Sequence, residues 1–223
     1  MHWQFISPRL SGLELTDTHF PQTSIVLSDV EDYRDQLFPA EAAEVEPMAE
    51  VRQIEFATGR HCAHLAQANL GLDVMGIPRK DRVPVWPAHS VGSITHSSKV
   101  AAAMASTHFH SVGLDIEELG RVGENLHRLL FVEEEEAYIA TSTFDAATVI
   151  FSAKEAGYKA IYPIAGKFIG FKEAQIHLDS SRQTFTIEYL GDHAAIRAVH
   201  SGQGYWQCHG DLVLTVFVIP RDI

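Results

Sequence analysis

The chain has 223 residues, of which 46% are hydrophobic and 21% charged, as in a soluble globular protein with one large or two small domains. Its net charge of −12 at pH 7 argues against a general nucleic-acid-binding protein. The longest apolar run, at 212–219, is too short to span a bilayer. Two cysteines, Cys62 and Cys208, are too few for a disulfide framework, and the first residues lack the pattern of a secretory signal. Both features favour a cytoplasmic protein.

Charge is unevenly distributed along the chain. Residues 28–50 carry eight acidic residues and one basic residue, whereas residues 52–99 carry six basic residues, three acidic residues and four histidines. An acidic chain with a local basic stretch is typical of a protein that binds a small anionic ligand or a charged protein partner. An ordinary fluctuation of surface charge produces the same pattern, so the segregation needs further support.

The first half of the chain is predicted to combine helices and strands. A short acidic helix is expected at 40–46 and a long helix at 49–70, where apolar residues recur at helical spacing. Proline residues predict a loop over 77–90. The small residues at 101–105 are expected to form a buried strand, because they lie between turn-forming serines and the alternating segment 112–117.

The second half continues this mixture. A helix is predicted over 125–141, with the acidic run 133–136 on its solvent face. Asp145 is expected to cap a second long helix that ends at Tyr162, before Pro163. Strands are predicted at 174–178, 184–190 and 212–219. The pattern indicates an α+β fold in which antiparallel strands pack against two long helices.

Two acidic residues share one face of the segment 112–117. Asp115 and Glu117 are two positions apart, so both carboxylates lie on the same side of a strand, opposite Leu114 and Ile116. Neighbouring carboxylates repel each other unless a cation lies between them. Mg²⁺ suits such a site because it prefers oxygen ligands and shares its coordination shell with substrate phosphates. An exposed pair of acids on an ordinary strand is the alternative.

A second candidate lies in the segment FSAKEAGYKA at 151–160. Glu155 and Lys159 are four residues apart and share a helix face, with Lys154 on the flank. They form either a surface ion pair worth about 0.3–0.5 kcal/mol or a metal-binding carboxylate with ammonium groups for phosphate oxygens. An anion pocket would form if the fold gathered the basic residues Arg52, Arg60, Lys80, Arg82 and His96.

Five segments in this order carry a resemblance to a known family. They are Arg52 with GRHCA at 59–63, PVWP at 84–87, GSITH at 92–96, VGLDIE at 112–117 and FSAKEAGYKA at 151–160. Over residues 50–175 the chain resembles the monomeric 4′-phosphopantetheinyl transferases that activate the enterobactin and surfactin synthetases. The GRHCA and PVWP segments are similar to the enterobactin-type branch.

The resemblance implies an activity and a fold. The expected reaction transfers the 4′-phosphopantetheine group of coenzyme A (CoA) to a serine of an apo acyl- or peptidyl-carrier protein and releases adenosine 3′,5′-bisphosphate. The expected architecture is a pseudo-dimer of two similar α+β halves, residues 1–112 and 113–223, with the active site in the cleft between them. The enzyme is expected to be a cytoplasmic monomer whose carrier protein serves siderophore, polyketide, nonribosomal peptide or fatty-acid synthesis, and the resemblance leaves these pathways open.

The resemblance also implies roles for individual residues. Asp115, Glu117 and Glu155 are expected to bind Mg²⁺, and Lys159 is expected to contact the CoA pyrophosphate beside Lys154. Catalysis is assigned to Glu155, Lys159 and Asp115, with either Glu155 or a metal-bound water as the general base. Contacts to the CoA phosphates, above all the 3′-phosphate, are expected from Arg52, Arg60, Lys80, Arg82, Thr95 and His96.

A histidine-ligated metallohydrolase is the alternative from another class. His61 and His64 are three residues apart, and His108 and His110 are two apart, which are spacings that metal ligands also show. The chain contains no His-Glu-x-x-His motif and no matching cysteine pair, so a structural role for these histidines is favoured.

Overall fold

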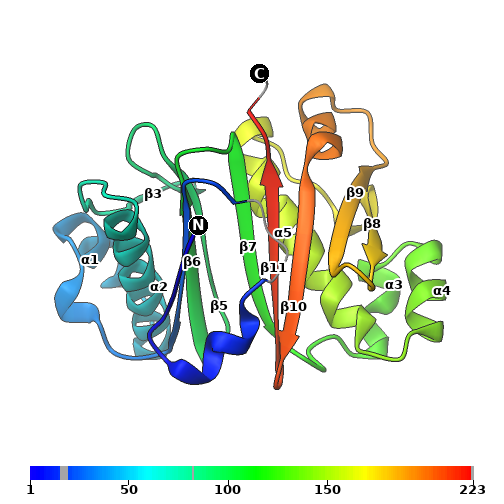
Figure 1. Ribbon diagram of the computed structural model, residues 1–223, viewed down its shortest axis with the longest axis horizontal. Helices are drawn as coiled ribbons and strands as arrows, with labels where there is room; N and C mark the ends of the chain where they lie inside the picture. Colours follow the sequence, from blue (N-terminus) through cyan, green and yellow to red (C-terminus); the bar gives the residue numbers. More distant parts are fainter. Residues whose placement is uncertain (16–19, 82, 222–223) are drawn as a thin grey trace.

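A computed structural model describes residues 1–15, 20–81 and 83–221 and has an α+β architecture with two halves, each a sheet packed on a long helix (Figure 1). The first main sheet has the strand order β1-β2-β6-β5 and the second the order β7-β11-β10-β9-β8. The first contains β1 (His2–Phe5), β2 (Thr23–Asp29), β5 (Val91–His96) and β6 (Val100–Ser106). The second contains β7 (Ser111–Glu118), β8 (Ala174–Asp179), β9 (Thr184–Tyr189), β10 (Gln203–His209) and β11 (Leu212–Ile219).

The two halves repeat one order of elements. In the first, β2 is followed by the short helix α1 (Pro39–Val45), the long helix α2 (Glu50–Asn69) and the hairpin β5–β6. In the second, β7 is followed by α3 (His127–Leu130), α4 (Glu133–Thr141), the long helix α5 (Ala146–Ala165) and, later, the hairpin β10–β11. In the first sheet β6 lies between β2 and β5, and in the second sheet β11 lies between β7 and β10. In each case the strand that comes last in the chain is the central one of the three. The repeat explains why both long helices cover one face of their own sheet (Figure 1).

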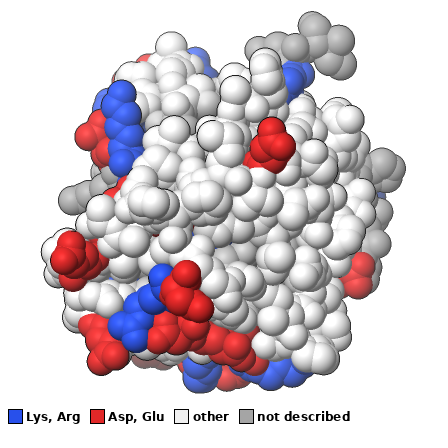
Figure 2. All heavy atoms as spheres, turned by 90° about the vertical axis from the view of Figure 1, so that its left-hand side faces the viewer, with Lys and Arg blue, Asp and Glu red and all other residues white. Residues whose placement is uncertain are grey.

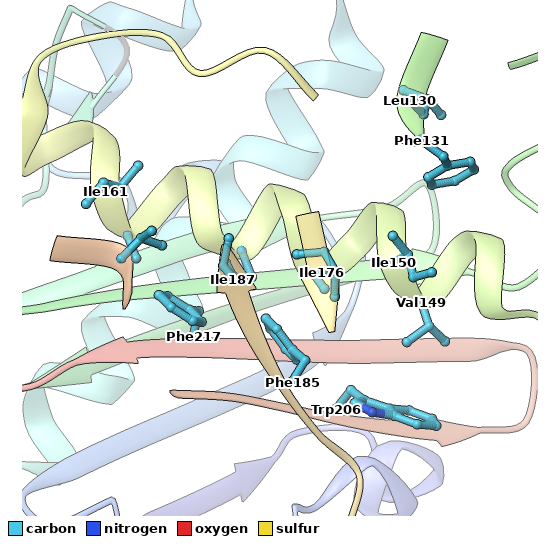
Figure 3. Packing of buried hydrophobic residues seen from close by; sticks show 14 of the residues in the cluster. Leu130, Phe131, Val149, Ile150, Ile161, Ile176, Phe185, Ile187, Trp206 and Phe217 are labelled. Carbon is cyan, nitrogen blue, oxygen red and sulfur yellow. The ribbon is translucent and has the colours of Figure 1, made fainter. Parts of the chain in front are cut away.

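A close approach between β7 and α5 sets the position of the residues that follow on β7. A Cβ atom at Gly113 would lie 1.8 Å from the carbonyl oxygen of Ala156, so only glycine lets the strand reach the helix backbone. In Figure 3 the apolar side of α5 carries Val149, Ile150 and Ile161 above the aromatic rings of the second sheet. These buried side chains hold α5 in place.

A separate apolar core joins the halves. Ile25 and Met104 from the first sheet pack in one cluster with Leu114 and Leu214 from the second, and all four are fully buried. Strand β5 also packs beside β7. The edge of the first sheet therefore meets the strand that carries Asp115 and Glu117. The small hairpin of β3 (Arg79–Lys80) and β4 (Val83–Pro84) precedes β5.

Several predicted elements are confirmed. The two long helices, the short acidic helix and the buried strand of small residues lie where the sequence predicts them. Asp145 caps α5 by accepting a hydrogen bond from the backbone N–H of Thr148 at 3.1 Å. No helix within the described ranges is long and apolar enough to cross a membrane.

Two predicted helix boundaries are wrong, and three strands of the main sheets were missed. The helix expected over 125–141 is interrupted because Phe131, fully buried, adopts an extended conformation and helix α4 restarts after it. Helix α5 continues through Pro163 to Ala165, because a proline in the last turn removes a single N–H, and Gly166 at φ 62° ends the helix. The strands β1, β2 and β10 were not predicted.

Candidate functional site

Asp115 and Lys159 form the centre of the candidate site. The Nζ atom of Lys159 on α5 lies 2.7 Å from Oδ1 of Asp115 on β7. It also donates to Oγ1 of Thr95 on β5 at 3.0 Å and to the carbonyl oxygen of Leu114 at 3.1 Å. The carboxylate of Asp115 is buried, whereas 26% of the Lys159 side chain is exposed. Three predicted residues from three elements thus meet where the two halves join.

Hydrogen bonds fix the orientation of the Asp115 carboxylate. Oδ1 accepts from Thr95 Oγ1 at 3.0 Å, and Oδ2 accepts from Ser152 Oγ at 2.8 Å. The Oγ atom of Ser152 also lies 2.8 Å from Oγ1 of Thr215 on β11. Ser152 and Thr215 are fully buried, and the sequence analysis did not find them. The position of Ser152 in the same motif, one helical turn before Glu155, is the signal that would have found it.

Glu117 and Glu155 complete a group of acidic residues around Asp115, which we call the carboxylate cluster. Burial, with the nearby charge of Asp115, raises the pKa of Glu117 to about 7. Burial also raises the pKa of Glu155; Asp115 adds to this effect and Lys159 opposes it. The cluster holds more negative charge than Lys159 compensates, which is the electrostatic condition that a cation would relieve.

The donor set of the cluster fits Mg²⁺. All three side chains offer carboxylate oxygens, the ligands that this ion prefers. Within the described ranges, no three His, Cys, Asp or Glu side chains are already arranged as a metal-ion shell.

Arg52 and His96 come together beside the cluster. The guanidinium of Arg52 on α2 contacts the imidazole of His96 at the end of β5, and Nη1 donates to Oε2 of Glu55 at 3.1 Å. Burial, together with the charge of Arg52, lowers the pKa of His96 to about 4, so its imidazole is neutral at pH 7. Glu55 links the two side chains and was not predicted from the sequence.

Arg60 is placed differently from the prediction. It is buried on α2, with its guanidinium 4.2 Å from the ring centre of Phe56 and its Nε 3.6 Å from Oε1 of Glu41. Burial lowers the pKa of Arg60 to about 10. Its Nε and Nη2 atoms have no hydrogen-bond partner among the described residues. The structure therefore separates Arg60 from Arg52, although both lie on α2.

Lys154 also departs from the prediction of a pyrophosphate contact. Its Nζ is buried against Oε2 of Glu135 at 2.7 Å and donates to the carbonyl oxygens of Leu130 and Phe171 at 2.9 and 2.6 Å. The reason is helical geometry, since Lys154 lies about 100° around α5 from Glu155. Its ammonium is already satisfied by these partners, although the residue also lines the cleft described below, so a contact with CoA stays a prediction.

Two basic candidates remain, Lys80 and Arg82. Lys80 on β3 is exposed, and the Arg82 prediction falls outside the described residues. The β3–β4 hairpin borders a cleft of about 1220 Å³ between the halves. The cleft is lined by Trp86 from the first half and by Tyr158 and Phe168 from the second. It provides an apolar cavity beside Glu155 and Lys159, which line it as well.

Acidic residues of the segment 28–50 form ion pairs near the surface. Nη2 of Arg34 lies 2.6 Å from Oδ2 of Asp32, and Nε of Arg79 lies 2.8 Å from Oε2 of Glu44. Figure 2 shows the side of the molecule that carries α1 and α2, where charges of both signs gather along the lower edge and left margin while uncharged side chains cover the middle. Such exposed pairs contribute little to stability.

The histidines of the metallohydrolase alternative have separate partners. The His61 ring stacks on Tyr33 with 3.9 Å between centroids, and Nε2 of His64 lies 3.0 Å from Oε1 of Glu41. The ring of His108 packs edge-on against Phe109. These contacts favour structural roles for the three histidines.

Comparisons with known proteins agree with this geometry. Residues 40–106 match the model of the 4′-phosphopantetheinyl transferase N-terminal domain, and residues 111–217 match that of the 4′-phosphopantetheinyl transferase superfamily. The chain is 34% identical to 4′-phosphopantetheinyl transferase Npt of Nocardia iowensis, over 68% of this chain and 74% of that protein. It is 33% identical to 4′-phosphopantetheinyl transferase Svp of Streptomyces mobaraensis, over 82% of this chain and 78% of that protein. It is 28% identical to enterobactin synthase component D of Escherichia coli K12, over 70% of this chain and 80% of that protein.

Proposed function

Because the chain belongs to the 4′-phosphopantetheinyl transferase superfamily, we propose that the carboxylate cluster and Lys159 are its reaction centre. The enzyme transfers phosphopantetheine from CoA to carrier proteins. In this reaction the hydroxyl oxygen of the carrier serine bonds to the phosphorus that carries pantetheine. The bond from that phosphorus to the bridging oxygen breaks, and adenosine 3′,5′-bisphosphate leaves. The observation that carries the proposal is the convergence of Asp115, Lys159 and Thr95 where the halves meet.

Mg²⁺, when bound, would neutralise the pyrophosphate and the charge that develops during transfer. Asp115, Glu117 and Glu155 would hold it, as the chemistry of their donors and their uncompensated charge support. Hydrogen bonds from Thr95 and Ser152 orient Asp115 for this role. A preset orientation reduces the reorganisation needed when substrate binds.

Lys159 positions the phosphates. Its Nζ is held by Asp115, Thr95 and the Leu114 carbonyl, and part of the side chain remains accessible from the cleft. An ammonium fixed in this way places a positive charge where oxygen atoms of the pyrophosphate would lie. Such a charge stabilises the transition state more than a mobile lysine would, because its orientation is already set.

Glu155 is assigned as the residue that orients the carrier serine, and the proton of that serine passes either to Glu155 or to water. Burial raises the pKa of Glu155 in the metal-free protein, which favours proton acceptance, whereas a bound cation would lower it again. The residue lies on α5 one turn before Lys159 and lines the cleft. Both groups can therefore face the same phosphorus.

Binding of the rest of CoA is assigned to the neighbouring surfaces. Contacts to the CoA phosphates, above all the 3′-phosphate, are proposed for Arg52, which lies beside the neutral His96, with Lys80 as a further candidate. The apolar cleft beside Trp86 and Tyr158 suits the uncharged pantetheine arm. We also propose a cytoplasmic monomer, in which residues 1–112 contribute phosphate-binding groups and residues 113–223 the carboxylate cluster.

The test of this proposal is Glu155→Gln. We incubate the wild type and the variant with CoA, Mg²⁺ and a panel of apo carrier proteins, and measure the phosphopantetheine adduct by mass spectrometry. The variant should retain its fold and lose most transfer. Glu188→Gln, on an exposed pair with His177, is the matched control and should keep full activity. Near-normal holo-carrier formation by Glu155→Gln would refute the assignment.

A further inference from the structure

A second hollow, of about 480 Å³, lies beside the carboxylate cluster. It contains Glu117 and also His96 and Glu55 of the Arg52 group, so it connects the cluster with the residues assigned to CoA phosphates. Its far wall is the turn that follows β7, which contributes Arg121. Neither the sequence motifs nor the assignments above give Arg121 a role.

The guanidinium of Arg121 faces Glu117 without a strong bond to it. Its Nε lies 3.9 Å from Oε2 of Glu117, and 63% of the side chain is exposed. At this distance and exposure the pair contributes little to stability. The guanidinium is therefore available to an anion that enters the hollow, and its planar donors match the oxygens of a phosphate.

The backbone under Arg121 is held in place, although the side chain is exposed. Gly120 has φ 80°, a conformation that favours glycine, and the N–H of Arg121 donates to the carbonyl oxygen of Glu118 at 3.0 Å. The N–H of Gly120 donates to Oδ2 of Asp145 at 2.6 Å. The other carboxylate oxygen, Oδ1, caps α5 at Thr148. Asp145 thus ties the turn that carries Arg121 to the helix that carries Glu155 and Lys159.

From this geometry we propose that Arg121 is a further binding residue for the CoA pyrophosphate, and that Asp145 is its positioning residue. The inference rests on the proposed function, because it takes the carboxylate cluster as the phosphate centre. The walls of the hollow carry acidic side chains, namely Glu55, Glu117 and Glu118. A phosphate there requires positive groups, and Arg121 supplies one from the turn that follows β7.

The first experiment measures CoA binding directly. Isothermal titration calorimetry is performed on wild type, Arg121→Ala and Arg121→Lys, with and without Mg²⁺. We expect Arg121→Ala to weaken CoA binding about tenfold or more, as loss of a hydrogen bond to a charged group does, and Arg121→Lys to recover part of the loss. Arg182→Ala is the matched control, since Arg182 forms an equally long pair with Asp179 at 3.9 Å on an exposed surface. It should bind CoA as the wild type does.

A second ligand locates the contact. If Arg121→Ala loses affinity for CoA but not for adenosine 3′,5′-bisphosphate, the guanidinium contacts the phosphate that carries pantetheine. If it loses affinity for both ligands, the guanidinium contacts the nucleotide's 5′-phosphate. Either result supports the proposal. Unchanged CoA binding by Arg121→Ala overturns it. A change confined to the KM for the carrier protein also overturns it, because Arg121 would then face the protein partner.

Asp145→Ser tests the positioning role. A serine can still cap α5, so the melting temperature should stay close to wild type, but it cannot also hold Gly120. We expect the KM for CoA to rise about threefold while the KM for the carrier is unchanged. An unchanged KM for CoA would refute the positioning role. If Glu155→Gln keeps normal activity while Arg121→Ala still loses CoA affinity, the proposed reaction centre fails and the phosphate contact of Arg121 stands.

Discussion

Glu41 and Glu135 occupy equivalent places in the two halves of the molecule. Each is the third residue of its short helix and is almost fully buried. Each accepts a hydrogen bond at 3.0 Å from the backbone N–H of its own helix cap, Phe38 or Val132. Each also accepts one from a distant backbone N–H, that of Ile77 at 2.7 Å or Ile176 at 2.8 Å. The two carboxylates thus attach equivalent helices to the rest of each half.

Each carboxylate also faces a buried cation on the long helix of its half, Arg60 on α2 and Lys154 on α5. The equivalence explains why two residues that resemble phosphate ligands in the sequence lie away from the carboxylate cluster. Their charges balance buried glutamates, which would otherwise be destabilising in a low-dielectric interior.

The first prediction concerns Lys154→Met. Removing the ammonium leaves Glu135 buried and unpaired, so the free energy of unfolding should fall by about 3–5 kcal/mol, measured by urea denaturation. At a temperature where the variant is folded, its KM for CoA should equal that of the wild type. Lys167→Met, at an exposed position, is the control for removing a lysine. A raised KM for CoA with unchanged stability would contradict this prediction and show that Lys154 contributes to CoA binding.

The second prediction concerns Gly113→Ala. The added methyl group would lie 1.8 Å from the Ala156 carbonyl oxygen, so β7 and α5 must separate, at a cost of about 3 kcal/mol or more. Transfer activity should fall as well, because Asp115 and Lys159 lie on the two separated elements. Gly123→Ala is the control, since its Cβ would meet only the flexible end of Asn125. Stability is measured by thermal denaturation, and an equal fall in melting temperature for Gly113→Ala and Gly123→Ala would contradict the prediction.

The third prediction concerns pH and Mg²⁺. The pKa of Glu117 is raised from its usual 4.5 to about 7, so the folded protein binds the proton more tightly than the unfolded chain. Without metal, this contribution to stability is complete below pH 4.5 and is lost as the pH rises to about 7. Mg²⁺ requires the ionised carboxylate, so it should raise the melting temperature at pH 8 and have little effect at pH 5.

Glu117→Gln provides the comparison for this prediction. The variant should show a flatter dependence of stability on pH across the same range, because the amide does not titrate. Mg²⁺ should also raise its melting temperature less at pH 8. Equal stabilisation of wild type by Mg²⁺ at both pH values would show that the ion binds elsewhere.

The fourth prediction concerns the ionisation of His96. Burial and Arg52 hold the His96 pKa at about 4 in the folded protein, against 6.5 in the unfolded chain. The stability that the neutral imidazole contributes is complete above pH 6.5 and is lost as the pH falls toward 4. Arg52→Gln should raise the pKa, measured by NMR titration of the ring, yet leave it below 6.5 because burial remains. The control Arg182→Gln should leave the His96 pKa unchanged. An unaltered His96 pKa in Arg52→Gln would contradict the contact between Arg52 and His96.

Much of the secondary structure and the candidate residues Asp115 and Lys159, which the structure brings together, could be identified from the sequence because both depend on local patterns. Helical spacing, the Asp145 cap and the alternation around Asp115 are properties of short segments. The boundary at Phe131 could not be predicted, since it depends on burial of that ring in the core of the second half. The same holds for Ser152 and Thr215, whose hydroxyls become useful only when α5 and β11 meet.

The sequence by itself determined the family, the long helices and the candidate acidic and basic residues of the proposed reaction centre, because motifs and periodicity are read along the chain. Tertiary structure alone decided which charges face one another. It turned Lys154 toward Glu135 and Lys159 toward Asp115, although both lysines lie on α5. It also placed Arg121 beside Glu117 through a turn tied to Asp145. Spacing along a helix sets the angle between side chains, but the partner of each face is set by how helices and sheets pack.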